Sequence, residues 1–267
     1  MQMGSKEVLA AIRRRTCAVG VLKVPVEEFV KDASAPLFKI LGTGFLVGPL
    51  TVLTNRHVVA SVTAYIEREV FPKNRRHIAF ERPDGQGVAM SFHEIEKMGM
   101  ATHPAFLDIG LITFRALPND PVCTLSPVEI PSEFRCDVGD AIAVYGYAFG
   151  ENLLKREFGQ RERTYRFGPV LQQGYISAIA PFEHAPRVDR LLLDVRTARG
   201  MSGSPVFDPL SGAVLGVHDS GVEDTVAFAI PLSSIMIADL LAIHASGSPG
   251  DPPGSGGVSW VTRRVDA

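Results

Sequence analysis

The stretch Ala198-Arg-Gly-Met-Ser-Gly-Ser-Pro-Val-Phe207 is the part of the sequence that most constrains the fold. Glycines flank Ser202 on both sides, so the backbone can turn sharply there and a reacting group can approach closely. Far upstream, His57 follows an apolar, strand-like run, and Asp108 precedes another such run. A histidine, an aspartate and a serine, each at the edge of a β-like segment, predict one catalytic triad.

Each of these residue types has a distinct part in such chemistry. A serine hydroxyl such as that of Ser202 is a poor nucleophile unless a neighbouring base takes its proton. His57 can be that base, because an imidazole with an ordinary pKa near 6.5 is mostly neutral at pH 7. Asp108 would orient the ring and fix its tautomer. The backbone N–H groups of Gly200 and Ser202 are spaced to form an oxyanion hole.

Length and charge exclude several classes of protein. The 267 residues fit one large all-β unit or two small domains. A formal net charge of −2 and a pI near 6.4 give no global basic field, so we expect no nucleic-acid partner. No apolar run reaches the roughly 18 residues of a membrane span, and the first residues lack the apolar core of a signal peptide. We therefore expect no membrane partner.

The cysteines point to a reducing compartment. Cys17, Cys123 and Cys136 are few, odd in number and far apart in the sequence. Extracellular proteins with this kind of site usually carry several disulfides, so the count predicts a cytoplasmic location. The three residues are expected to be small, buried apolar side chains rather than nucleophiles or metal ligands.

Many short β-like segments at turn-like spacing predict an all-β sandwich or a pair of barrels. One of the expected strands covers Val62–Phe71. The expected organisation is an N-terminal helix at 1–17, a first β unit at 18–116, a crossover at 117–140, a second β unit at 141–231, a C-terminal helix at 232–245 and a flexible Gly/Ser/Pro-rich tail at 246–267.

Four motifs carry a resemblance to a known family. In chain order they are Gly42-Thr-Gly-Phe-Leu-Val47, Thr54-Asn-Arg-His-Val58, Asp108-Ile-Gly-Leu-Ile112 and Gly200-Met-Ser-Gly-Ser-Pro205. Together they resemble the chymotrypsin-like (trypsin-fold) serine proteases, most closely the bacterial HtrA-like, trypsin-like peptidases, over about Ala18–Ile243.

The resemblance implies a fold and a reaction. The fold would be two six-stranded antiparallel β-barrels, with His57 and Asp108 from the first barrel and Ser202 from the second. The chain would be a serine endopeptidase that hydrolyses peptide bonds of protein or peptide substrates through an acyl-enzyme. Such a reaction needs no metal ion and no cofactor.

Two departures from the family pattern bear on regulation. Met201 stands where secreted zymogens carry an aspartate, so activation by insertion of a new N-terminus is not expected. The length also leaves no room for the C-terminal PDZ domain of typical HtrA proteins. The charged segment 151–168 falls where the family has a loop that borders the active site. It is either a solvated insertion or a functional loop that gates the oxyanion hole or offers a cleavage site. In the functional case, a regulatory protein partner would act on it.

The resemblance also places a substrate pocket. Arg196 would lie at its base and favour an acidic P1 residue, unless it faces solvent. Val226 would narrow the pocket and favour small or medium P1 side chains. The other expected wall residues are Thr197, His218 and Ser220.

The remaining histidines have minor expected roles. His218 is expected beside the triad aspartate, and His103 is the only rival to His57 as base. Surface or turn positions are expected for the other four, which lack metal-ligand spacing. They are His77, His93, His184 and His244.

Two alternative functions compete with the endopeptidase. One is a catalytically latent, protease-fold binding or regulatory module that needs a partner or a loop cleavage for activity. Its signature would be a missing triad residue, and none is missing. The other is an esterase of the α/β-hydrolase kind, which the order His, Asp, Ser and the lack of a strand–Ser–helix elbow disfavour.

Overall fold

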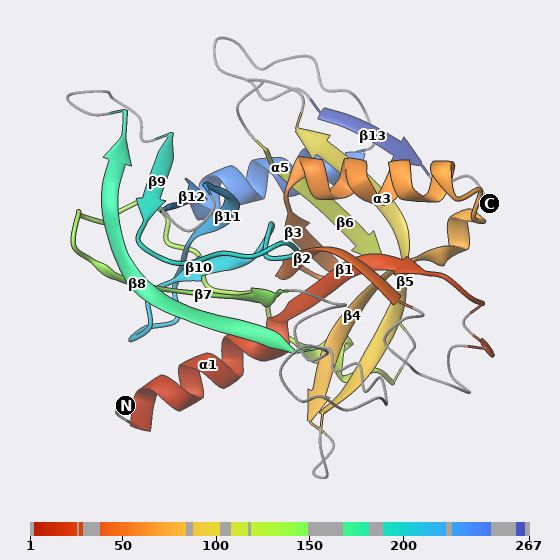
Figure 1. Ribbon diagram of the computed structural model, residues 1–267, viewed down its shortest axis with the longest axis horizontal. Coiled ribbons are helices and arrows are strands. Elements are labelled where there is room, and N and C mark those ends of the chain that lie inside the picture. Colours follow the sequence, from red (N-terminus) through yellow and green to blue (C-terminus); the bar gives the residue numbers. More distant parts are fainter. Residues whose placement is uncertain are drawn as a thin grey trace.

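Two closed antiparallel β-barrels of six strands each form the body of the protein, which confirms the expected all-β fold (Figure 1). The computed structural model describes residues 3–25, 27–28, 38–83, 88–101, 108–116, 119–148, 168–181, 189–222, 226–246 and 260–264. The expected loop at 151–168 lies outside the described residues except for its last position.

The first barrel has the strand order β5-β4-β1-β2-β3-β6 and closes through pairing of β5 with β6. Strand β1 is buried along its whole length, as expected for a strand with barrel core on one side and packed elements on the other. The strands are β1 (Thr16–Leu22), β2 (Phe38–Gly48), β3 (Thr51–Thr54), β4 (Arg76–Pro83), β5 (Val88–Ala101) and β6 (Gly110–Phe114).

The second barrel has the closed order β10-β11-β12-β9-β8-β7. Its β10 is short and begins three residues after Ser202, so the Ser202 loop leads directly into the barrel. The strands are β7 (Ala141–Tyr147), β8 (Pro169–Ala180), β9 (Arg190–Leu193), β10 (Pro205–Phe207), β11 (Val214–Val222) and β12 (Val226–Pro231).

Three α-helices pack on the barrels, at Met3–Arg15 (α1), Arg56–Arg68 (α3) and Ser234–Ser246 (α5). Two short 3₁₀ helices, η2 and η3, occupy Lys73–Arg75 and Pro121–Thr124. The first helix joins both barrels, because Arg13 pairs with Glu81 of β4 and the Tyr145 hydroxyl of β7 donates to the same carboxylate. None of the described helices is long and apolar enough to cross a membrane.

Helix α3 overturns the strand expected at Val62–Phe71. The segment is rich in β-branched and aromatic residues, which favour strands when local propensity alone decides. The helix instead buries one apolar face against the first barrel, and this tertiary packing outweighs the propensity. The buried residues of that face recur at helical spacing: Val58, Val59, Val62 and Ile66.

The tail and the cysteines also differ from expectation. Trp260–Arg264, part of the expected flexible tail, forms strand β13 and pairs with β5; residues 247–259 lie outside the described residues. Cys17 is buried as expected. The expectation of burial is wrong for Cys123, which is exposed on η3.

Helix α3 ends in a Schellman motif with an unusual residue at its left-handed position. Phe71 N–H donates to Ile66 C=O (3.0 Å), and Val70 N–H donates to Glu67 C=O (3.4 Å). Glycine is the usual residue at this position, but here it is Val70, whose φ is 54° and whose side chain is 86% exposed. A β-branched residue is strained in this conformation.

Replacing Val70 with glycine is therefore expected to stabilise the protein by about 1 kcal/mol, because the left-handed penalty of roughly 1–2 kcal/mol outweighs the entropy of an added glycine. Urea unfolding would measure the change. Val138→Gly is the matched control, since Val138 is also exposed but has no positive φ, and it should lower stability. Equal losses for both variants would contradict the prediction.

Candidate active site

Helix α3 begins at the site, and Asp108 completes its first turn. Asn55 precedes the helix, but its side chain makes no capping hydrogen bond. The backbone N–H of His57 donates instead to Asp108 Oδ1 (2.8 Å). A carboxylate at a helix N-terminus is also stabilised by the helix dipole. Asp108 is thus held by the same helix that carries His57.

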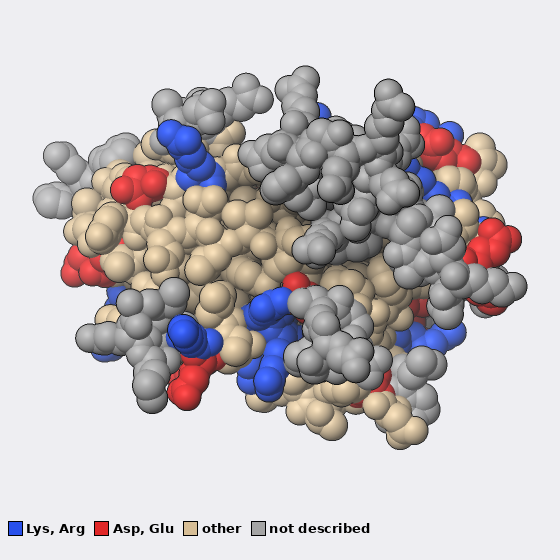
Figure 2. Space-filling view, turned by 60° about the horizontal axis from the view of Figure 1, so that its bottom comes forward, with Lys and Arg blue, Asp and Glu red and all other residues tan. Residues whose placement is uncertain are grey.

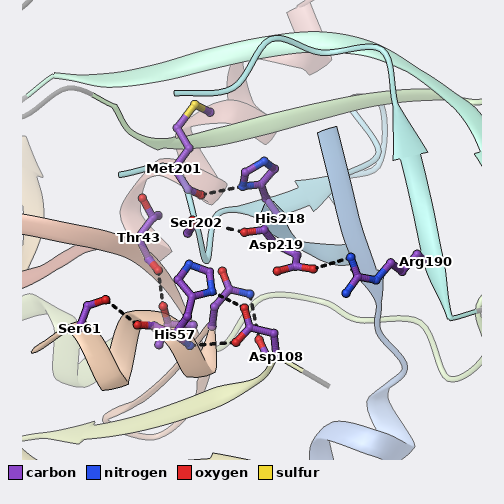
Figure 3. Close-up of polar contacts among 11 residues, drawn as sticks. Thr43, His57, Ser61, Asp108, Arg190, Met201, Ser202, His218 and Asp219 are labelled. Carbon is purple, nitrogen blue, oxygen red and sulfur yellow. Dashed lines mark hydrogen bonds and ion pairs between the residues drawn. The ribbon is translucent and has the colours of Figure 1, made fainter. Parts of the chain in front are cut away.

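The second carboxylate oxygen orients the histidine ring. Asp108 Oδ2 and His57 Nδ1 form a hydrogen bond, so the other ring nitrogen, Nε2, is not used in this pairing (Figure 3). The Asp108 carbonyl in turn accepts from Asn55 Nδ2 (3.0 Å). The aspartate is therefore anchored through both its side chain and its backbone.

The pairing shifts both pKa values. Burial lowers the pKa of His57, but the hydrogen bond and charge of Asp108, together with the charge of Asp219, outweigh it and raise the pKa above its ordinary value. Burial raises the pKa of Asp108, but the hydrogen bonds from His57 outweigh it and lower the pKa. The pair therefore favours a carboxylate beside a histidine that takes up a proton readily.

Ser202 lies at the end of a tight turn. Met201 N–H donates to Ala198 C=O (3.1 Å), and Gly200, the third residue of the turn, has a φ of +96°. Arg199, the second residue, has no positive φ, so the turn is of type II. Among the described residues, the N–H groups of Gly200 and Ser202 donate no hydrogen bond.

The Ser202 hydroxyl does not bond to His57 in this structure. Its Oγ donates to the backbone carbonyl of Asp219 (3.3 Å), whose side chain lies beside the His57–Asp108 pair (Figure 3). Catalytic hydrogen bonds are often long or absent in unliganded enzymes and form only with substrate. The Ser202 hydroxyl is thus hydrogen-bonded to the backbone beside the His57–Asp108 pair and not to the pair itself.

Thr43 of the first barrel holds the serine loop of the second. Its N–H donates to Ser202 C=O (2.8 Å), and its Oγ1 donates to Gly200 C=O (2.8 Å). The same Oγ1 accepts from Tyr147 N–H (2.9 Å). The preceding residue must be small, because a Cβ at Gly42 would meet both Val58 and the Ser202 carbonyl. At the level of sequence, this motif entered only as part of the family resemblance, and its contact with the Ser202 loop was not predicted.

Asp219 is a site residue that the sequence did not predict. A β-bulge in the β11–β12 pairing lies between His218 and Ser220, so Asp219 is the additional residue of the bulge. Bulges re-aim side chains, and here the carboxylate turns toward His57 and Asp108. Figure 3 shows it between that pair and Arg190, whose Nη1 lies 3.1 Å from Asp219 Oδ2.

His218, expected beside the triad aspartate, is displaced by this bulge. It is buried, and its Nδ1 lies 3.2 Å from the Met201 carbonyl. Burial lowers its pKa to about 4, with a smaller effect of the His57 charge. The neighbour of the aspartate is therefore Asp219, one residue later than expected.

Among the described residues, the side chains of His57, Asp108 and Asp219 are close enough together to be considered as metal ligands. Donor atoms of His57, Asp108 and Asp219 lie within 4.8 Å of one another. Two of them already bond to each other, and Arg190 holds the third. A cation at this position is disfavoured by the guanidinium, so we do not assign a metal site.

The residues expected to form the substrate pocket differ in their exposure to solvent. Arg196 is exposed, as in the alternative that it faces solvent. Thr197 packs against Gly221, since a Cβ at 221 would meet Thr197 Oγ1 at 2.5 Å. Ser220 is exposed and Val226 is half-buried. Their part in P1 selection stays a prediction.

Three of the remaining histidines are buried, which corrects the expectation that they lie at the surface or in turns. His77, His93 and His244 are buried because they lie on strand or helix faces that pack inward. Burial lowers the pKa of His77 and of His244 to about 4. His103 and His184 lie outside the described residues.

Charges on the surface are mixed. On the face shown in Figure 2, described Lys and Arg residues are interspersed with Asp and Glu among uncharged residues. This matches the small net charge of −2. The clustered basic face typical of nucleic-acid-binding proteins is absent from the described part of this view.

Solved structures with the same fold are serine proteases. Rv3671c from M. tuberculosis H37Rv, in an inactive serine-to-alanine form, is 20% identical with a TM-score of 0.54, over 91% of this chain and 93% of that one. A serine endoprotease from Yersinia pestis is 16% identical with a TM-score of 0.56, over 93% and 70%. The active form of the Rv3671c protease is 18% identical with a TM-score of 0.51, over 94% and 87%. At these identities the likeness shows the fold alone.

Two barrels that bring a histidine–aspartate pair next to a serine loop define the chymotrypsin-like class of serine proteases. The family model of the trypsin-like peptidase domain matches residues 42–217, from β2 into β11. A search of curated proteins found no match. The chain belongs to the trypsin-like peptidase family. It is a trypsin-like serine protease, and its substrates are proteins or peptides.

Proposed function

We propose that the chain is an endopeptidase in which Ser202, His57 and Asp108 act as a catalytic triad. The proposal depends on one observation: the Asp108 carboxylate makes two hydrogen bonds to His57, one with its backbone N–H (2.8 Å) and one with Nδ1. It leaves Nε2 as the one basic ring nitrogen that can serve the nucleophile. For the reaction, the Ser202 hydroxyl would exchange its hydrogen bond to the Asp219 carbonyl for one to His57 Nε2.

The proposed reaction passes through an acyl-enzyme on Ser202. Ser202 Oγ attacks the scissile carbonyl carbon, and its proton passes to His57 Nε2. The tetrahedral intermediate places its oxyanion against the N–H groups of Gly200 and Ser202. The imidazolium returns the proton to the leaving amine, and an acyl-enzyme remains on Ser202. Water, deprotonated by His57, then releases the acid product and restores the serine.

The turn at Ala198–Met201 supports the oxyanion hole. A type II turn flips the central peptide relative to a type I turn, and the N–H of that peptide belongs to Gly200. Because the Gly200 and Ser202 N–H groups have no acceptor among the described residues, both are available to an oxyanion. One such donor is worth about 2.7–4 kcal/mol of barrier.

Labelling with a fluorophosphonate probe tests the proposal. The wild-type chain should form a covalent adduct at Ser202 and cleave an unfolded protein substrate. Ser202→Ala should lose the adduct and lower kcat about 10⁶-fold, because no other group can form the acyl-enzyme. The mass of the labelled peptide identifies the site.

Ser211→Ala is the matched control, since Ser211 lies in a surface turn where its Oγ donates to Asp208. It should label as the wild type does. A wild-type chain that neither labels nor cleaves would contradict the endopeptidase and favour the latent binding module.

Location in the cytoplasm stays a prediction. The small and odd number of cysteines supports it, since proteins of oxidising compartments commonly carry several disulfides. The regulatory partner expected at residues 151–168 concerns a segment that lies almost wholly outside the described residues.

A further inference from the structure

A second carboxylate stands at the His57–Asp108 pair. The Asp219 side chain is only 7% exposed, and its donor atoms lie within 4.8 Å of those of His57 and Asp108. A buried carboxylate this close to another is unfavourable unless a positive charge offsets it. Arg190 supplies that charge at 3.1 Å, and its guanidinium also lies 6.0 Å from the Phe228 ring centroid.

We infer that Asp219 is a positioning residue for the proposed reaction: its carboxylate acts through His57, making the ring a stronger base, and Arg190 keeps that carboxylate ionised. The inference rests on the proposed function, because it assigns a role within the same triad. Asp219 does not touch the reacting atoms. Its backbone carbonyl holds the resting hydroxyl of Ser202, and its side chain acts on the base.

The physical basis is the charge that His57 acquires. When His57 takes the proton of Ser202, the imidazolium that forms has two carboxylates beside it, those of Asp108 and Asp219. Both negative charges favour that cation, and both act within a partly buried site where charges are less screened than in water. Asp219, on β11 of the second barrel, therefore stabilises the same step as Asp108, which precedes β6 of the first barrel.

Charged groups around the pair set the pH at which this works. His57 is faced by Asp108 and Asp219, which raise its pKa, and by Arg56, which lowers it. Burial raises the pKa of Asp219 to about 6, with further increases from Asp108 and decreases from Arg190 and His57. The buried His218 is the other titratable group near His57, and it stays neutral at these pH values.

Removing the Asp219 charge is expected to shift the pH dependence of kcat/KM. His57 must be neutral to act as base, so its raised pKa sets the acid limb of the kcat/KM profile. Removing the Asp219 charge makes the imidazolium less favourable and lowers the pKa of His57. The acid limb should therefore move to lower pH.

The test compares Asp219→Asn, which keeps the size of the side chain, with Asp219→Ser, which guards against misfolding of the first variant. Both should retain a larger fraction of their plateau kcat/KM at mildly acidic pH than the wild type does. The ring signals of His57, followed by NMR through a pH titration, should shift their midpoint in the same direction. A purely structural role would change the melting temperature or kcat without moving either midpoint.

Asp208→Asn is the matched control, because Asp208 is a carboxylate of the same barrel that caps a surface turn through Leu210 N–H. It should leave the acid limb unchanged. Arg190→Gln should move the carboxyl titration of Asp219, followed by ¹³C NMR, to higher pH. An unchanged Asp219 titration would remove Arg190 from the inference.

The two proposals fail in different ways. If the wild type cleaves substrate and both Asp219 variants keep the wild-type acid limb and the wild-type His57 titration, the role of Asp219 is overturned and the triad stands. If the wild type does not label with a fluorophosphonate, the endopeptidase fails. The His57 titration by NMR still decides whether Asp219 acts on the ring.

Discussion

Asp108→Asn is expected to lower kcat/KM about 10⁴-fold without unfolding the protein. Asparagine can still accept the His57 backbone N–H with its amide oxygen, which preserves the start of α3. Its amide nitrogen then faces Nδ1 and donates to it. The ring proton is thereby forced onto Nε2, where it blocks acceptance of the Ser202 proton. Steady-state kinetics at the plateau pH would measure the loss.

Asp120→Asn is the matched control for this variant. Asp120 is also buried in the first barrel, accepts the Val122 N–H (2.9 Å) and lies 3.7 Å from His93 Nε2. The same change of charge beside another histidine should leave kcat/KM unaltered. An Asp108→Asn enzyme with near-normal kcat/KM would show that the aspartate does not set the tautomer.

Gly203→Ala is expected to cost more than about 4 kcal/mol of stability, a loss seen only where the structure cannot adjust. A Cβ at this position would clash with the Thr43 carbonyl oxygen and with Thr54 Oγ1, both on the first barrel. The φ of +87° adds the penalty of a left-handed residue. Urea unfolding and the yield of folded protein would measure the effect.

Gly139→Ala separates the two causes. Gly139 has a similar φ of +96°, but nothing lies within 4 Å of its Cβ position. Its substitution should cost only the backbone penalty of roughly 1–2 kcal/mol. Equal losses at both positions would show that contact between the barrels contributes little at Gly203.

Much of the fold could be predicted because its determinants are local. Short apolar runs separated by turn residues indicate strands. The helix expected at 1–17 is present at Met3–Arg15. Helix α3 could not be predicted in this way, since its valines and aromatic residues favour a strand until a barrel surface is present for them to cover. Strand β13 depends likewise on the free edge of β5.

The candidate site shows the same division. His57, Asp108 and Ser202 were predicted because each stands in a motif with its own backbone requirement. Asp219 was missed by one position, because a bulge changes which side chain points inward and leaves no mark in composition or periodicity. Thr43 entered only as part of a motif that carries the family resemblance. Its bonds to the serine loop join residues of different barrels, so no local sequence pattern indicates them.

The contacts of Thr43 have a consequence for how proteolytic power arises during the life of the chain. The alcohol that would attack substrate comes from the last-made half of the polypeptide, and its surroundings are set by the first-made half. Because the proposed triad is divided between the two halves, neither half alone is expected to hydrolyse a substrate. A nascent or truncated chain should therefore be inactive until both barrels are complete and in contact.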